Sequence, residues 1–128
     1  TEKDFQDTLD VVEYSKFDLV YMFKFSPRPG TLAYDMKDEY ISNDVINDRF
    51  LRLKDLQTNI SEKRYKRFQN TEQKLLVEKT SKKNSEIFTG RIDGGQLTHI
   101  SKHNISVGDI VNVRIVDTTP FYLKAELL

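Results

Sequence analysis

From Glu72 onward the chain contains five short runs rich in Val, Ile, Leu, Phe and Tyr, separated by turn-forming residues. In the fourth run Val111, Val113 and Ile115 fall on one face of an extended strand, with Asn112, Arg114 and Val116 on the other. Five short strands in so few residues predict a small antiparallel β-barrel of the OB type. The expected strands are Lys74–Thr80, Ile87–Ile92, Leu97–Ile100, Ile110–Asp117 and Tyr122–Leu127.

A long amphipathic helix is predicted before the barrel, over residues 43–68. Ser42 is a suitable N-cap, and Ile41 and Ile46 are placed as a hydrophobic staple. Apolar residues then recur every three or four positions from Ile46 to Ile60, which defines one helical face. At 1.5 Å per residue this helix would be about 39 Å long, enough to bridge two domains.

The N-terminal region reads as half of an α/β unit. Thr1 and Asp4 form a capping-box pattern, and apolar residues at helical spacing predict a helix over residues 2–15. Phe17–Phe25 is almost continuously apolar and β-rich, so we expect a strand buried on both faces, as in parallel sheets. The neighbours of such a strand are not in this chain, which we therefore expect to be a piece of a longer protein.

A proline- and glycine-rich loop follows this expected strand. Two prolines and Gly30 exclude regular structure over residues 26–31. In α/β folds, ligands bind at the carboxyl ends of strands, so Arg28 is a candidate substrate-facing residue. The alternative is that Arg28 is an exposed arginine in a turn.

Composition excludes several classes of site. The chain has no cysteine, so it cannot by itself form a disulfide, a thiolate zinc site or an iron–sulfur cluster. The two imidazoles, His99 and His103, have no convergent third ligand, and we expect no metal site and no catalytic residues. No apolar run is long enough to span a bilayer, and we expect no membrane association.

Net charge is zero, with 20 basic and 20 acidic residues, but the charge is unevenly distributed. Residues 1–40 carry five basic and nine acidic side chains, whereas residues 41–70 carry seven and four. The run Lys63-Arg64-Tyr65-Lys66-Arg67 is either a phosphate-binding patch or a solvated helix end.

Basic residues also accompany the first three barrel strands. If these strands are neighbours, the side chains could form one RNA-binding surface, with an imidazole available for stacking. An ordinary polar barrel face is the alternative. The candidate RNA-binding residues are Lys79, Lys82, Lys83, Arg91, His99 and Lys102.

Three segments give the whole chain a resemblance to the bacterial tRNA methylthiotransferases, most closely those that modify N6-isopentenyladenosine. They are FSPRPGTLAYDM over 25–36, LLVEKTSKKNSEIFTGRIDGGQL over 75–97, and the C-terminal SVGDIVNVRIVDTTPFYLKAEL. The chain departs from the family pattern at Ile92 and at Leu97-Thr98-His99-Ile100.

The resemblance implies an α+β organisation: 1–40 as the end of a truncated α/β radical-SAM barrel, 41–70 as a connecting helix, and 71–128 as a TRAM barrel that binds RNA. It also implies that the parent enzyme methylthiolates C2 of the adenine, using two 4Fe-4S clusters and S-adenosylmethionine. This chain would bind the tRNA anticodon stem-loop, without cofactors or activity of its own.

The expected location is the cytoplasm, and the isolated chain is expected to self-associate through residues 17–25. Two alternatives stay open. One is a methylthiotransferase acting on threonylcarbamoyl-adenosine in tRNA or on a ribosomal protein. The other is a stand-alone RNA-binding module.

Overall fold

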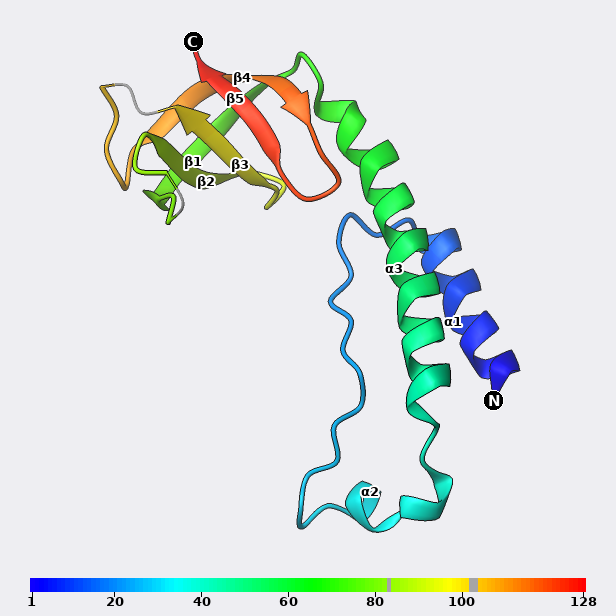
Figure 1. Cartoon of the computed structure of the whole chain (residues 1–128). Coiled ribbons are helices and arrows are strands. Elements are labelled where there is room, and N and C mark those ends of the chain that lie inside the picture. The colour runs from blue at the N-terminus through cyan, green and yellow to red at the C-terminus, as the bar shows by residue number, and fades with distance from the viewer. Residues whose placement is uncertain (83, 102–103) are drawn as a thin grey trace. The chain divides into compact units, whose positions relative to one another are not determined.

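The computed structural model describes residues 1–82, 84–101 and 104–128, which divide into two units, Thr1–Ile60 and Ser61–Leu128. The first unit contains three helical segments, an extended segment and the larger part of a long helix. The second contains the end of that helix and a closed β-barrel (Figure 1). The boundary between the units falls inside the long helix α3 (Asn43–Tyr65).

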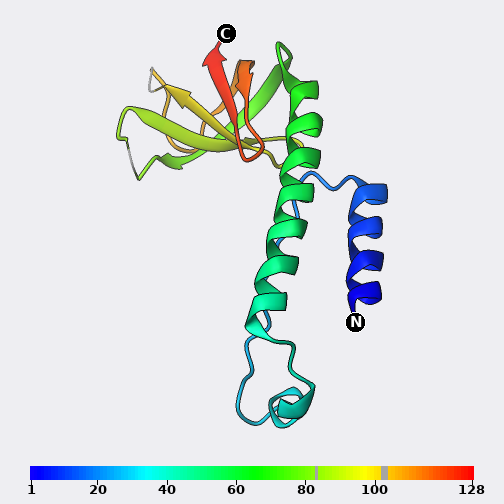
Figure 2. The same cartoon turned by 45° about the vertical axis from the view of Figure 1, so that its right-hand side comes forward.

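Helix α1 (Glu2–Ser15) confirms the predicted helix and its capping box. The backbone N–H of Asp4 donates to the Thr1 hydroxyl at 3.3 Å, and the Thr1 ammonium donates to the Asp4 carboxylate at 2.8 Å. Within the first unit, α1 lies beside α3 in both views (Figures 1 and 2). Arg52 of α3 donates to the Glu2 carboxylate at 2.6 Å, and its guanidinium lies 4.9 Å from the centre of the Phe5 ring.

Residues 17–25 do not form the strand that was predicted. The segment is extended, but no described segment pairs with it to form a ladder. Alternate side chains at 18, 20 and 22 are half-buried, whereas Tyr21 is 77% exposed and Phe23 is 86% exposed. Because a strand requires hydrogen bonds to a neighbour, an apolar sequence alone does not produce one here.

The loop after this segment leads into two short helical turns, α2 (Leu32–Asp35) and the 3-10 helix η1 (Lys37–Glu39). Thr31 caps α2, because its hydroxyl accepts a hydrogen bond from the Tyr34 backbone N–H at 3.2 Å. Gly30 has a φ of +84°, which a glycine adopts without strain and which turns the chain into α2.

Helix α3 begins as predicted. The backbone N–H of Ile46 donates to the Ser42 carbonyl at 3.0 Å. After Tyr65 the helix tightens into the 3-10 helix η2 (Lys66–Phe68), so helical structure ends at the predicted residue. The positions of the predicted apolar face are half-buried or, at Ile60, buried.

Five strands form the barrel of the second unit, close to the predicted positions (Figure 2). Their order around the barrel is β1-β2-β3-β5-β4. The strands are β1 (Glu72–Thr80), β2 (Ile87–Ile92), β3 (Leu97–Ser101), β4 (Ile110–Thr118) and β5 (Leu123–Leu127).

The expectation of a purely antiparallel barrel is wrong in one pairing. Strands β3 and β5 are parallel, with Thr98 opposite Leu123 and Ile100 opposite Ala125. Closure explains this difference, since an odd number of strands in a ring cannot reverse direction at every step. One neighbouring pair must therefore run in the same direction.

The core of the second unit consists of the inward-facing strand residues and the end of the helix. Leu75, Val113 and Leu123 are fully buried, and the predicted alternation in β4 is confirmed by Val113 and Ile115. Tyr65, at the end of α3, is 4% exposed and belongs to the same cluster. Its ring contacts Phe68 edge-to-face at a centroid distance of 6.5 Å.

Candidate nucleic-acid interface

Strands β1, β2 and β3 are neighbours, which is the condition on which the predicted RNA-binding surface depends. Cross-strand partners form a row of polar residues on the outward side of the sheet, in which Thr89 is only 5% exposed. Lys79 of β1 lies opposite Thr89 of β2, which lies opposite His99 of β3, which lies opposite Lys124 of β5. Directly opposed residues share one face of a sheet. The row, Lys79–Thr89–His99–Lys124, crosses four strands and therefore spans about 14 Å.

A β-bulge places Lys79 in this row. The register between β1 and β2 shifts between Val77 and Lys79, so that Val77 faces Gly90 while Lys79 faces Thr89. The Thr89 hydroxyl donates to the Lys79 carbonyl at 3.3 Å. A bulge inserts one extra residue and re-aims the side chains that follow. Without it, Lys79 would lie on the other face of the strand.

Arg91 lies two residues from Thr89 on the same face of β2, and its guanidinium is held on two sides. It donates to the Gly95 carbonyl at 2.7 Å and lies 3.5 Å from the Glu78 carboxylate. The neighbouring carboxylate partly neutralises the positive charge. An RNA phosphate would therefore compete with Glu78 for this arginine.

His99 is packed against an aromatic ring. Its imidazole lies 4.5 Å from the Tyr122 ring, centre to centre, with the ring planes tilted by 42°. Burial lowers the pKa of His99 below its usual value, so the ring is neutral at pH 7. The role open to it is stacking and hydrogen bonding, and the neutral ring adds no positive charge.

Lys124 ends the row in an ion pair with Asp117 of β4, at 2.6 Å between Nζ and Oδ2. The Lys124 hydrogen bond lowers the pKa of Asp117, and the same bond raises the pKa of Lys124. Both groups are therefore charged at neutral pH and present a donor and an acceptor side by side.

The remaining predicted site residues are not gathered into this row. Lys82 is exposed and lies two residues after the end of β1. Lys83 and Lys102 lie outside the residues that the structure describes. Arg28 belongs to the first unit, where its carbonyl accepts hydrogen bonds from Thr31 and its side chain is exposed.

Sequence reasoning missed Tyr122, Lys124 and Asp117. Lys124 stands between the inward-facing Leu123 and Ala125, and this alternation in the sequence identifies it as an outward residue of the last strand. Lys124 lies beside His99 only because β3 pairs with β5, and no local sequence pattern specifies that pairing.

The iron–sulfur clusters implied by the family resemblance do not fit this chain, because it contains no cysteine to hold them. Within residues 1–82, 84–101 and 104–128, no group of three His, Asp or Glu side chains is placed to hold a metal ion. Among the helices of these same residues, none has the length and apolar content to cross a membrane.

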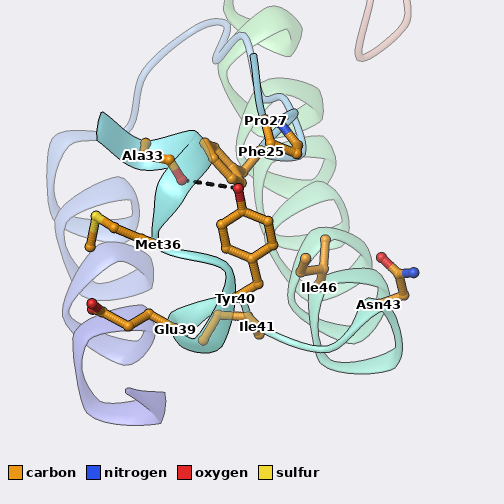
Figure 3. A pocket seen from close by; sticks show the side chains of 9 residues that line it. All are labelled: Phe25, Pro27, Ala33, Met36, Glu39, Tyr40, Ile41, Asn43 and Ile46. Carbon is orange, nitrogen blue, oxygen red and sulfur yellow. Dashed lines mark hydrogen bonds between the residues drawn. The ribbon is translucent and has the colours of Figure 1, made fainter. Parts of the chain in front are cut away.

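The first unit contains a separate apolar pocket of about 450 Å³ (Figure 3). Phe25 and Tyr40 meet edge-to-face in it, at a centroid distance of 5.5 Å. The Tyr40 hydroxyl donates to the Ala33 carbonyl at 3.0 Å, and Figure 3 shows this bond directed across the pocket. The lining has one charged side chain, Glu39, and otherwise consists mainly of apolar groups.

Comparison with known proteins supports the sequence-based resemblance. Residues 66–128 match the TRAM domain family. Over 98% of its length the chain is 40% identical to "tRNA-2-methylthio-N(6)-dimethylallyladenosine synthase" of Corynebacterium jeikeium, of which it covers 25%. Proteins of the same name from Finegoldia magna and Aquifex aeolicus are 38% and 39% identical over the whole chain, which covers 28% of each. The chain thus spans about a quarter of the length of these relatives, and the predicted resemblance is confirmed.

Proposed function

We propose that this chain, whose residues 66–128 belong to the TRAM domain family, supplies the tRNA-binding part of a tRNA methylthiotransferase. The observation that carries the proposal is the row Lys79–Thr89–His99–Lys124 on the barrel. It places two lysines and an imidazole on one side of the sheet, with the buried Thr89 between them. Small barrels use cationic and ring-bearing side chains of this kind to bind RNA.

The full-length protein would carry out the modification named in its relatives, on an adenosine of tRNA. The cluster-binding and S-adenosylmethionine-binding residues of a radical-SAM enzyme would then lie outside this chain, since the chain has no cysteine. We expect the isolated chain to be inactive. The division into 1–40, 41–70 and 71–128 stays a prediction.

The proposed partner is the anticodon stem-loop of tRNA, bound in the cytoplasm. Phosphates of the RNA backbone would contact Lys79 and Lys82, both of which are exposed. Lys83 and Lys102 are further candidates for phosphate contacts. Arg91 would contribute after exchanging its interaction with Glu78 for a phosphate.

We also propose that the isolated chain self-associates through the exposed face of residues 17–25. Tyr21 and Phe23 present large apolar surfaces to solvent, and exposed apolar patches of this kind promote association. In the full-length protein this face would be covered by other parts of the polypeptide. In the isolated chain it would cause self-association.

The test is the salt dependence of RNA binding by the whole 128-residue chain, using an anticodon stem-loop RNA. Counterion release makes the logarithm of affinity fall linearly with the logarithm of salt concentration, by about 0.7 for each phosphate contact to a single strand. The double variant Lys79→Ala, Lys82→Ala should bind more weakly and reduce the slope by about 1.4.

Lys74→Ala is the matched control. It removes one lysine charge, half the change of the double variant, from an exposed position on β1 whose neighbour is Asn112 of β4, away from the row. Its salt slope should equal that of the wild type. An unchanged slope in the folded double variant, or an equal loss in the control, would contradict the proposed surface.

A further inference from the structure

We propose that the His99–Tyr122 ring pair and the hollow beside it form a subsite for one unpaired nucleobase. The inference rests on the proposed RNA binding and specifies which part of the barrel contacts a base and which part contacts phosphate. Tyr122, Lys124 and Asp117 acquire roles that the sequence did not indicate.

The backbone that carries the Tyr122 ring is fixed by the turn between β4 and β5. The Thr119 hydroxyl accepts hydrogen bonds from the backbone N–H groups of Phe121 at 3.2 Å and Tyr122 at 3.0 Å. The Thr119 backbone N–H donates to the Tyr122 carbonyl at 2.9 Å. Such a turn orders Tyr122 before any ligand binds, which lowers the entropic cost of stacking.

The hollow beside the pair, about 190 Å³, is lined by both apolar and polar groups. Ile87 and Val116 contribute apolar side chains, whereas Ser101, Lys124 and Glu126 contribute polar groups. A flat heteroaromatic ring has apolar faces and a hydrogen-bonding edge, so its surface matches this lining. A phosphate group offers no apolar face.

The charges around the subsite also favour a base over a phosphate. His99 is uncharged at pH 7 because burial lowers its pKa. Lys124 is paired with Asp117, and Glu126 adds a carboxylate to the lining of the hollow. The lining therefore offers donors and acceptors with little net positive charge, while Lys79 and Lys82 remain exposed to bind the backbone.

Substitution of the ring pair provides the first test. We would measure binding of the whole chain to an anticodon stem-loop RNA in which a loop adenosine is replaced by fluorescent 2-aminopurine. Tyr122→Leu and His99→Ala should weaken binding at least about fivefold and reduce fluorescence quenching, while the salt slope stays that of the wild type. His99→Phe keeps a ring and should keep the quenching.

Tyr14→Leu is the matched control, since Tyr14 is 90% exposed on α1 in the other unit. Its affinity and quenching should equal those of the wild type. If folded Tyr122→Leu and His99→Ala variants bind and quench like the wild type, the subsite is refuted while the phosphate surface survives. Absence of RNA binding by the wild-type chain would overturn both proposals.

A second measurement needs no substitution. Adenosine monophosphate and ribose 5-phosphate share the sugar phosphate and differ in the base. With the wild-type chain, the nuclear magnetic resonance signals of the His99 ring protons should move upfield on addition of the nucleotide, through the ring current of the stacked base. Equal shifts with both compounds, or none with either, would contradict base stacking at this site.

Discussion

Replacing Gly90, a glycine of strand β2, by alanine should destabilise the barrel more than the same change at a glycine of its turns. A Cβ atom at this position would lie 1.9 Å from the Leu76 carbonyl oxygen and 3.0 Å from the Leu75 Cδ1 atom. Gly90 pairs with Val77 of β1 and Thr98 of β3, so both neighbouring strands limit how far β2 can move.

The expected cost follows from what must move. An ordinary contact between carbon and oxygen is longer than 3 Å, so β1 and β2 would have to separate by about 1 Å. Overpacking a well-packed interior usually costs 1–3 kcal/mol, and more when the obstructing atom belongs to the backbone. We expect the Gly90→Ala variant to lose about 3 kcal/mol or more of its free energy of unfolding, a large fraction of the 5–15 kcal/mol typical of a domain.

Gly95→Ala is the control in the adjacent turn. Gly95 has a φ of +82° but nothing within 4 Å of the added Cβ, so only backbone strain of about 1–2 kcal/mol is expected. Urea unfolding would measure the free energy of unfolding of the two variants, and amide exchange would measure the protection of their barrel strands. If both lose the same free energy, the close approach of β1 and β2 at Gly90 does not limit the packing of this barrel.

Two further predictions concern pH and association. Because burial lowers the pKa of His99, the unfolded chain binds a proton more readily than the folded barrel, so the free energy of unfolding should fall as pH drops below about 6.5. Urea unfolding between pH 7.5 and 5.5 should show a smaller fall in the His99→Phe variant. Equal pH profiles for the variant and the wild type would contradict this assignment to His99. The double change Tyr21→Ser, Phe23→Ser should reduce the self-association that light scattering measures. The control Leu76→Ser, which removes a 43%-exposed apolar residue from β1, should leave self-association unchanged. A wild-type chain that stays monomeric at high concentration would refute this prediction.

The prediction for residues 17–25 shows where sequence patterns were insufficient. Their β-rich composition indicated a strand, but the backbone groups of these residues have no ladder partner in the described part of the chain. Helix α3 covers only one side, through contacts such as the Gln57 side chain donating to the Phe17 carbonyl at 2.9 Å. Strand formation depends on a neighbour, and local composition cannot supply one.

Helices and strand positions were determined by the sequence itself. The capping pattern at Thr1 and Asp4, the staple around Ser42 and the alternation in β4 act between residues a few positions apart, so their outcome can be predicted without the rest of the chain. The five barrel strands follow for the same reason, because each is bounded by turn residues in its own neighbourhood.

The candidate site was decided by the tertiary structure. Closure of five strands requires one parallel pair, and the barrel places that pair at β3 and β5, which brings Lys124 and Tyr122 to His99. The bulge after Val77 then aligns Lys79 with Thr89. These residues lie up to 45 positions apart in the chain, from Lys79 to Lys124. Their arrangement depends on strand order and register, which are set by closing and packing the whole barrel rather than by any local pattern.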